Sequence, residues 1–251
     1  MKNYIIEDQF KLQVARGKIK GATVINIFGH NNSQGTDFRT VWEKSDTTGL
    51  LKPASALQMT VTSDIGDTSD DGVIIRVIGL DANYDVIAEN VTLNNATPPI
   101  TTNSFLRINT VVTISGNATG NVSVSNGANE YAHILAGTGK NQASIYTVPA
   151  GYSFYLYRID GFMNDAASAK SGEFRNKSTL SSGVVLRVAD TPFINQMNIQ
   201  RRFPFKYGEK TDIEFQIRSL SGTNYCGVFG EGIQIKDDTP IPGNTDYLYF
   251  P

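Results

Sequence analysis

Alternation of apolar and polar residues with a period of two is the dominant pattern along the chain. Residues 56–62 place Leu57, Met59 and Val61 on one face and polar side chains on the other, as in a strand that is buried on one side. No helix longer than about two turns is predicted. The pattern, or a short β-branched run, recurs in the expected strands 23–28, 73–80, 86–93, 105–115, 121–125, 143–148, 152–160, 183–189, 193–199, 211–219 and 227–235.

Turn-forming residues separate these segments. Asp81–Asp85 and Gly116–Gly120 each lie between two expected strands and predict hairpins, because Asp, Asn and Gly favour tight turns. Thr97-Pro98-Pro99 is expected to be a connection, since proline cannot donate to a sheet ladder. Residues 165–171 are expected to form one short helical turn or a loop. The fold class is therefore all-β, with β-sandwich domains of the jelly-roll or immunoglobulin-like kind.

The domain organisation is predicted from a change in composition. Residues 136–141 are small and polar, which is typical of a linker. We therefore expect a first β-sandwich domain over 17–135 and a second over 142–236. Extended arms are expected at 1–16 and, in a segment rich in chain breakers and aromatic residues, as a C-terminal tail at 237–251.

Composition and charge exclude several classes of protein. The net charge is −2 and only 18% of residues are charged, so the chain lacks the basic surface that nucleic-acid binding needs. No apolar run is long enough to span a membrane, and the start of the sequence has no signal peptide. The single cysteine, Cys226, allows no internal disulfide. We expect synthesis in a reducing cytosol and no nucleic-acid or membrane partner.

The sequence predicts no catalytic centre. Its two histidines, His30 and His133, lie in separate expected segments, and no serine stands in a nucleophile elbow. Cys226 is expected to be a small buried apolar residue. The run Gly137–Asn141 lacks the spacing of a phosphate loop. A glycan hydrolase that uses two carboxylates remains a less favoured alternative, because such enzymes need only a pair of acids.

One acidic loop could hold a metal ion. Asp64, Asp67, Asp70 and Asp71 lie within eight residues of one another, and Ca²⁺ prefers oxygen-rich sites of this kind. A solvated turn is the simpler interpretation. The loop is the only place where we consider a cofactor, a structural calcium ion.

Two segments are candidates for contacts between subunits. Arg201 and Arg202 form a basic cluster beside aromatic residues, which could pair with acidic groups of a neighbour. The alternating aromatic residues of 152–157 are expected to be core. The tail carries a run of large apolar side chains that must either pack on its own domain or dock on another subunit: Tyr247, Leu248, Tyr249 and Phe250.

Three segments carry a resemblance to a known family. Residues 79–109, the turn Tyr146–Tyr152 and the segment Phe205–Ile213 together resemble a family of virion structural proteins of tailed bacteriophages, especially marine ones. The resemblance covers roughly residues 15–235. It implies a virion component and supplies no catalytic residues.

These observations predict a non-enzymatic virion structural protein. The favoured role is a capsid decoration or cement protein that stabilises the shell through subunit contacts, with the major capsid protein and other copies of itself, as a trimer or higher homo-oligomer, for partners. The alternative is a neck, tail or fibre component that binds a host surface glycan. In either case its location is the virion.

Overall fold

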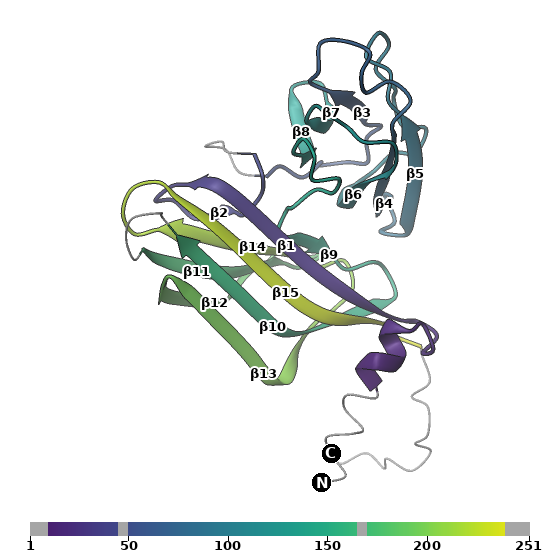
Figure 1. The fold of residues 1–251 in the computed structure, drawn as a ribbon. Helices are drawn as coiled ribbons and strands as arrows, with labels where there is room; N and C mark the ends of the chain where they lie inside the picture. The colour runs from purple at the N-terminus through teal and green to yellow at the C-terminus, as the bar shows by residue number, and fades with distance from the viewer. Residues whose placement is uncertain (1–9, 45–49, 165–169, 239–251) are drawn as a thin grey trace.

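The computed structural model describes residues 10–44, 50–164 and 170–238, and these form an all-β protein with one short helix at 10–15 (Figure 1). The predicted fold class is confirmed. Every paired strand is antiparallel. The residues expected to form arms are described only in part, and residues 165–169, where a helical turn or loop is expected, lie outside the described residues.

The larger unit is built from eight strands and one short additional strand. In chain order the eight are β1 (Ala22–Gln34), β2 (Arg39–Thr40), β10 (Tyr152–Asn164), β11 (Ser171–Thr179), β12 (Val185–Ile194), β13 (Gln196–Tyr207), β14 (Asp212–Ser219) and β15 (Asn224–Lys236). The additional strand, β9 (Ile145–Thr147), pairs with β14.

These strands form two layers with the connectivity of a jelly roll. The front sheet has the order β1-β15-β10-β13, and the back sheet has the order β12-β11-β14-β2. The sheets are joined at a single pair, Ile194 and Gln196, where Asn195 turns the chain with a φ of 58°. Counted along the chain, the front sheet thus holds strands 1, 8, 3 and 6 and the back sheet strands 5, 4, 7 and 2, which is the double Greek-key order of a jelly roll.

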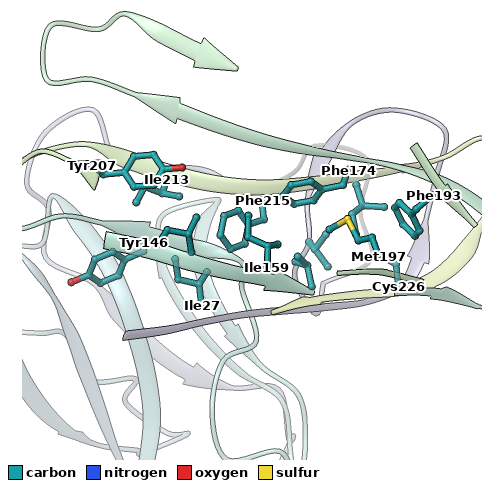
Figure 2. Packing of buried hydrophobic residues seen from close by; sticks show 14 of the residues in the cluster. Ile27, Tyr146, Ile159, Phe174, Phe193, Met197, Tyr207, Ile213, Phe215 and Cys226 are labelled. Atoms are coloured by element: carbon teal, nitrogen blue, oxygen red, sulfur yellow. The ribbon is translucent and has the colours of Figure 1, made fainter. Parts of the chain in front are cut away.

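The core of the roll lies between the two sheets and is rich in aromatic residues (Figure 2). Phe154 of the front sheet and Phe174 and Phe215 of the back sheet are fully buried. Gly230 and Gly232 of β15 make room for two of these rings, because a Cβ at either position would lie 2.3 Å from Phe215 or Phe154. The glycine content of β15 is therefore a packing requirement.

The smaller unit is inserted between β2 and β9. One of its sheets contains β3 (Thr60–Ser63), β7 (Val122–Asn126) and β8 (Asn129–Ile134), and the other contains β4 (Ile74–Leu80), β5 (Val86–Thr92) and β6 (Arg107–Ser115). A separate buried cluster, which includes Met59, Ile75, Phe105 and Val124, lies between them. This inserted domain is a second, smaller β-sandwich.

The sheets divide the chain differently from the expected domains 17–135 and 142–236. β1 pairs along its length with β15, about two hundred residues later, so residues 22–40 belong to the same roll as the second half of the chain. The expected linker 136–141 runs along β6, where Lys140 pairs with Val112. The physical reason is that the partner of a strand is set by long-range packing, which a local pattern does not encode.

The inserted domain is fixed against the roll by polar contacts. Arg107 of β6 binds Asp212 of β14 through two hydrogen bonds of 2.8 and 3.0 Å. The Asn109 side chain accepts a hydrogen bond from the Thr147 amide and donates one to the Thr147 carbonyl. These contacts seat the inserted domain at one edge of the back sheet.

Candidate functional site

The acidic loop does not gather its carboxylates. Asp70 is fully buried and accepts hydrogen bonds from Ser63, Thr119 and Gly120. Burial alone would raise its pKa, but these hydrogen bonds outweigh it and lower the pKa to about 2. Asp70 is therefore an acceptor that organises the inserted domain.

The other three aspartates bind separate protein donors. Asp64 accepts from the backbone and side chain of Asn121, Asp67 accepts from the Ser69 amide, and Asp71 accepts from the Asn95 amide. Among the described residues, no group of three or more His, Cys, Asp or Glu side chains is placed to hold a metal ion. The carboxylates of this loop thus have local hydrogen-bonding roles, and the structural calcium ion considered above stays a prediction.

A serine, a histidine and a glutamate do meet in the inserted domain. Glu130 accepts a hydrogen bond of 2.7 Å from Ser123 and lies 2.6 Å from Nδ1 of His133. Ser123 Oγ lies 3.5 Å from that same ring nitrogen. A catalytic triad needs the serine and the acid on opposite ring nitrogens, so this cluster lacks that geometry. Lys44 also binds Glu130 and ties the cluster to the segment after β2.

The outward faces of the two sheets differ in chemistry. The back sheet carries ion pairs on its outward face: Glu173 with Arg218, Arg175 with Asp190, and Lys177 with Glu214.

The front sheet carries aromatic and aliphatic side chains on its outward face. Phe28 of β1 lies opposite Phe229 of β15, and Tyr225 packs against Phe162 with ring centroids 5.5 Å apart. Phe28 is 40% exposed and Tyr225 is 42% exposed. Because single exposed apolar residues are ordinary but gathered ones mark contact sites, this face is the candidate functional surface.

One end of the front face is a groove between the short helix and a bulge of β13. The register of β10 with β13 breaks between Leu156 and Arg158, where residues 201–204 of β13 are left without partners. The groove has a volume of about 490 Å³. Its walls and floor come from the helix, β10, β13 and β15: Phe10, Lys11, Tyr155, Tyr157, Arg158, Gln200, Arg201, Arg202, Pro204, Glu231, Ile233 and Ile235.

The groove is basic around an aromatic floor. The Tyr157 hydroxyl donates to Glu231, and burial together with that carboxylate raises the pKa of Tyr157. Lys11 Nζ lies 4.1 Å from the centre of the Tyr157 ring, a cation–π contact. The Nε atom of Arg201 is buried and has no hydrogen-bond partner among the described residues. The groove therefore offers cations and ring faces to an acidic, aromatic ligand.

The sequence located this site in part. Arg201 and Arg202, expected as a contact cluster, line the groove. The aromatic segment expected as core divides between two faces, because Phe154 is buried while Tyr155 and Tyr157 line the groove. The other expected contact residues, Tyr247, Leu248, Tyr249 and Phe250, lie outside the described residues.

A second hollow of about 490 Å³ lies at the other end of the front face. Phe28, Phe162 and Phe229 contribute rings, and Asp160 and Asn198 contribute polar groups. The Asn198 amide donates to Asp160. We call this the aromatic hollow.

Comparison with known proteins gives only weak likenesses. No family model and no curated protein matches the chain. Among solved structures, the infectious bursal disease virus VP2 subviral particle matches at 11% identity with a TM-score of 0.25, covering 88% of this chain and 74% of that one. The structure of the Gx strain of that virus matches at 10% identity and a TM-score of 0.24, with the same coverage of both chains. The strand order above, and not these likenesses, identifies the jelly roll. Within the described ranges no helix is long and apolar enough to cross a membrane.

Proposed function

We propose that this chain is a non-enzymatic structural component of a virion, and that it decorates the outside of the capsid. The observation that carries the proposal is the gathering of aromatic side chains on the outward face of the front sheet, where Phe28 and Tyr225 are exposed, while the back sheet carries ion pairs on its outward face. Jelly rolls recur in viral capsid domains, although also in lectins and cupins. The resemblance of residues 79–109 to phage virion proteins favours the first of these.

The proposed mechanism is burial of the front face against the shell or a neighbouring subunit. A stable contact buries about 1,600 Å² in total, and aromatic residues are enriched at the centres of such contacts. Repeated over many copies, this contact holds neighbouring capsid subunits together. Low net charge keeps repulsion between copies small.

The test is location on the particle together with self-association. Electron microscopy of source virions labelled with an antibody to this chain is expected to show label over the whole shell. Label at one vertex or on the tail would contradict decoration. In sedimentation velocity experiments, the Phe28→Ser and Phe229→Ser double variant should associate less than wild type. Ile100→Ser is the matched control, because Ile100 is 62% exposed but lies on the inserted domain.

A second candidate is a tail or fibre component that binds a host glycan. The aromatic hollow favours it, since ring faces beside carboxylate and amide groups can stack on and hydrogen-bond to a sugar. The purified chain should then bind to a glycan array, and binding should be lost in Phe162→Ser and retained in Ile100→Ser. This result together with label at a vertex would establish this candidate over the first.

A further inference from the structure

We propose that the groove binds residues 246–250 of the same polypeptide chain, so that the free subunit covers its own basic-aromatic groove. This inference concerns the isolated subunit and stands independently of where the protein sits in a particle.

The groove and residues 246–250 are complementary in charge and in side-chain type. Four cations line the groove, Lys11, Arg158, Arg201 and Arg202, against a single acid, Glu231. Residues 237–251 contain three aspartates and no lysine or arginine. Asp246 is followed directly by Tyr247-Leu248-Tyr249-Phe250, which pairs one carboxylate with a run of large apolar side chains.

The half-buried Arg201 in the wall points the same way. Arg201 stacks on Phe205, with 5.7 Å from the guanidinium carbon to the ring centre, while its Nε is buried without a hydrogen-bond partner among the described residues. The Arg201 guanidinium is one of the cations that line the groove. A carboxylate that enters the groove meets this charge, and Asp246 is the acid that adjoins the aromatic run.

The last described residues of the chain, at the end of β15, lie next to the groove. Ile235 lines the groove, and the chain is still held just after it, where the Asp237 amide donates to the Gly151 carbonyl and Ser153 donates to the Asp237 side chain. Eight residues lie between Asp238 and Tyr247, and the nine Cα–Cα steps that join these two residues span at most about 30 Å. Pro240 and Pro242 lack the amide donors that continuation of β15 would need.

A short connection also favours the same copy over a neighbour. A connection of this length gives an effective concentration in the millimolar range, well above the micromolar concentration of purified protein. We therefore expect an intramolecular contact. The segment of a neighbouring subunit should enter the groove only if the subunit's own segment is displaced from it.

Disulfide trapping tests the contact. Gln200 lines the groove and is exposed, so Gln200→Cys combined with Leu248→Cys should form an intramolecular disulfide under mild oxidation at micromolar concentration. The control pair is Asn83→Cys with Leu248→Cys, since Asn83 is exposed in the β4–β5 turn. Cys226 is fully buried and should not take part. We expect the groove pair to form its bond about tenfold faster than the control pair. Fluorescence of the buried Trp42 verifies that each variant is folded.

Three outcomes would overturn the inference. Equal rates in the two pairs would mean that the segment does not visit the groove. Disulfide-linked dimers on a non-reducing gel, without the monomeric product, would mean that the occupant is a neighbour's segment. If Arg202→Glu left the rate of disulfide formation in the groove pair unchanged, charge would not hold the segment in the groove. Arg187→Glu on β12 is the matched control, because it also replaces an exposed cation.

Discussion

Arg107 and Asp212 join the two β-sandwiches through a two-pronged ion pair, with Nε–Oδ1 at 2.8 Å and Nη2–Oδ2 at 3.0 Å. Both side chains are largely buried. Burial alone would raise the pKa of Asp212, but the hydrogen bonds from Arg107 and the charges of Lys52 and Arg107 keep it below its ordinary value. The pair therefore stays charged in the folded protein.

Removing Arg107 should destabilise the junction strongly. Arg107→Ala leaves Asp212 buried with only Lys52, 3.5 Å away, as a charged partner. We expect the free energy of unfolding to fall by about 3 kcal/mol, as for other buried pairs that lose one member. Urea denaturation measures this. The control is Lys236→Ala, which removes an exposed pair with Asp238 and should cost less than about 0.5 kcal/mol. A similar loss in both variants would contradict the role of the junction.

Acid should weaken the inserted domain through Asp70. Its folded pKa of about 2 lies below the ordinary 3.8, so its contribution to stability is complete above about pH 4 and is lost as the pH falls towards 2. Asp70→Asn should lower stability at neutral pH and flatten the dependence on pH in this window. A residual slope is expected from Glu130. Burial alone would raise the pKa of Glu130, but its interactions with His133, Lys44 and Ser123 outweigh burial and lower this pKa to about 2 as well.

Thermal unfolding of Asp70→Asn and wild type at pH 2, 3, 4 and 5 measures the contribution of Asp70 to the pH dependence of stability. Asp85→Asn, in the exposed β4–β5 turn, is the matched loss of one carboxylate. Stability curves of Asp70→Asn and wild type that run parallel through this window would show that Asp70 does not couple folding to protons.

A methyl group on β15 should disturb the core of the roll. The Cβ of Gly232→Ala would lie 2.3 Å from the Phe154 ring and 2.6 Å from the Tyr155 carbonyl oxygen. Overpacking of this kind costs about 1–3 kcal/mol. Gly208→Ala is the control, since nothing lies within 4 Å of its added Cβ. Equal melting temperatures for the two variants would refute the packing role of Gly232.

Cys226 should be unreactive until the protein unfolds. The side chain is fully buried, and burial raises the pKa of its thiol to about 12, so almost no thiolate is present at neutral pH. Reaction with a chromogenic disulfide reagent should be slow in buffer and rapid in denaturant. Fast labelling of the folded protein would place Cys226 at an accessible site. Burial of this residue agrees with the expectation from the sequence.

The sequence predicted most strands but not their partners. The β-branched run 73–80 forms β4, and the alternating segment 211–219 forms β14. β11 was not predicted, because its buried face carries Gly172, Phe174, Asn176 and Ser178 and thus only one large apolar side chain. Period-two reading depends on apolar residues and misses such a strand.

The groove illustrates the same limit. Arg201 and Arg202 could be recognised as a cluster, but Lys11 and Glu231 come from distant parts of the chain. The pairing of β10 with both β13 and β15 brings Glu231 to the same surface as the arginines, and packing of the helix residue Val14 with Ile233 brings Lys11 there. The bulge that leaves residues 201–204 of β13 without partners is a break in register between two strands, which the pattern of one segment does not predict.

The attachment of the inserted domain has an architectural consequence. Thr40 of β2 lies opposite Gln216, and Ile145 of β9 lies opposite Glu214, so the chain departs and returns two positions apart on one strand. A short loop could bridge that interval while all eight strands of the roll kept their partners, provided that Asp212 were given a new cation; Glu214 would keep Lys177 of β11. The domain is thus a detachable module, and a lineage could exchange what it displays without redesigning the scaffold beneath it.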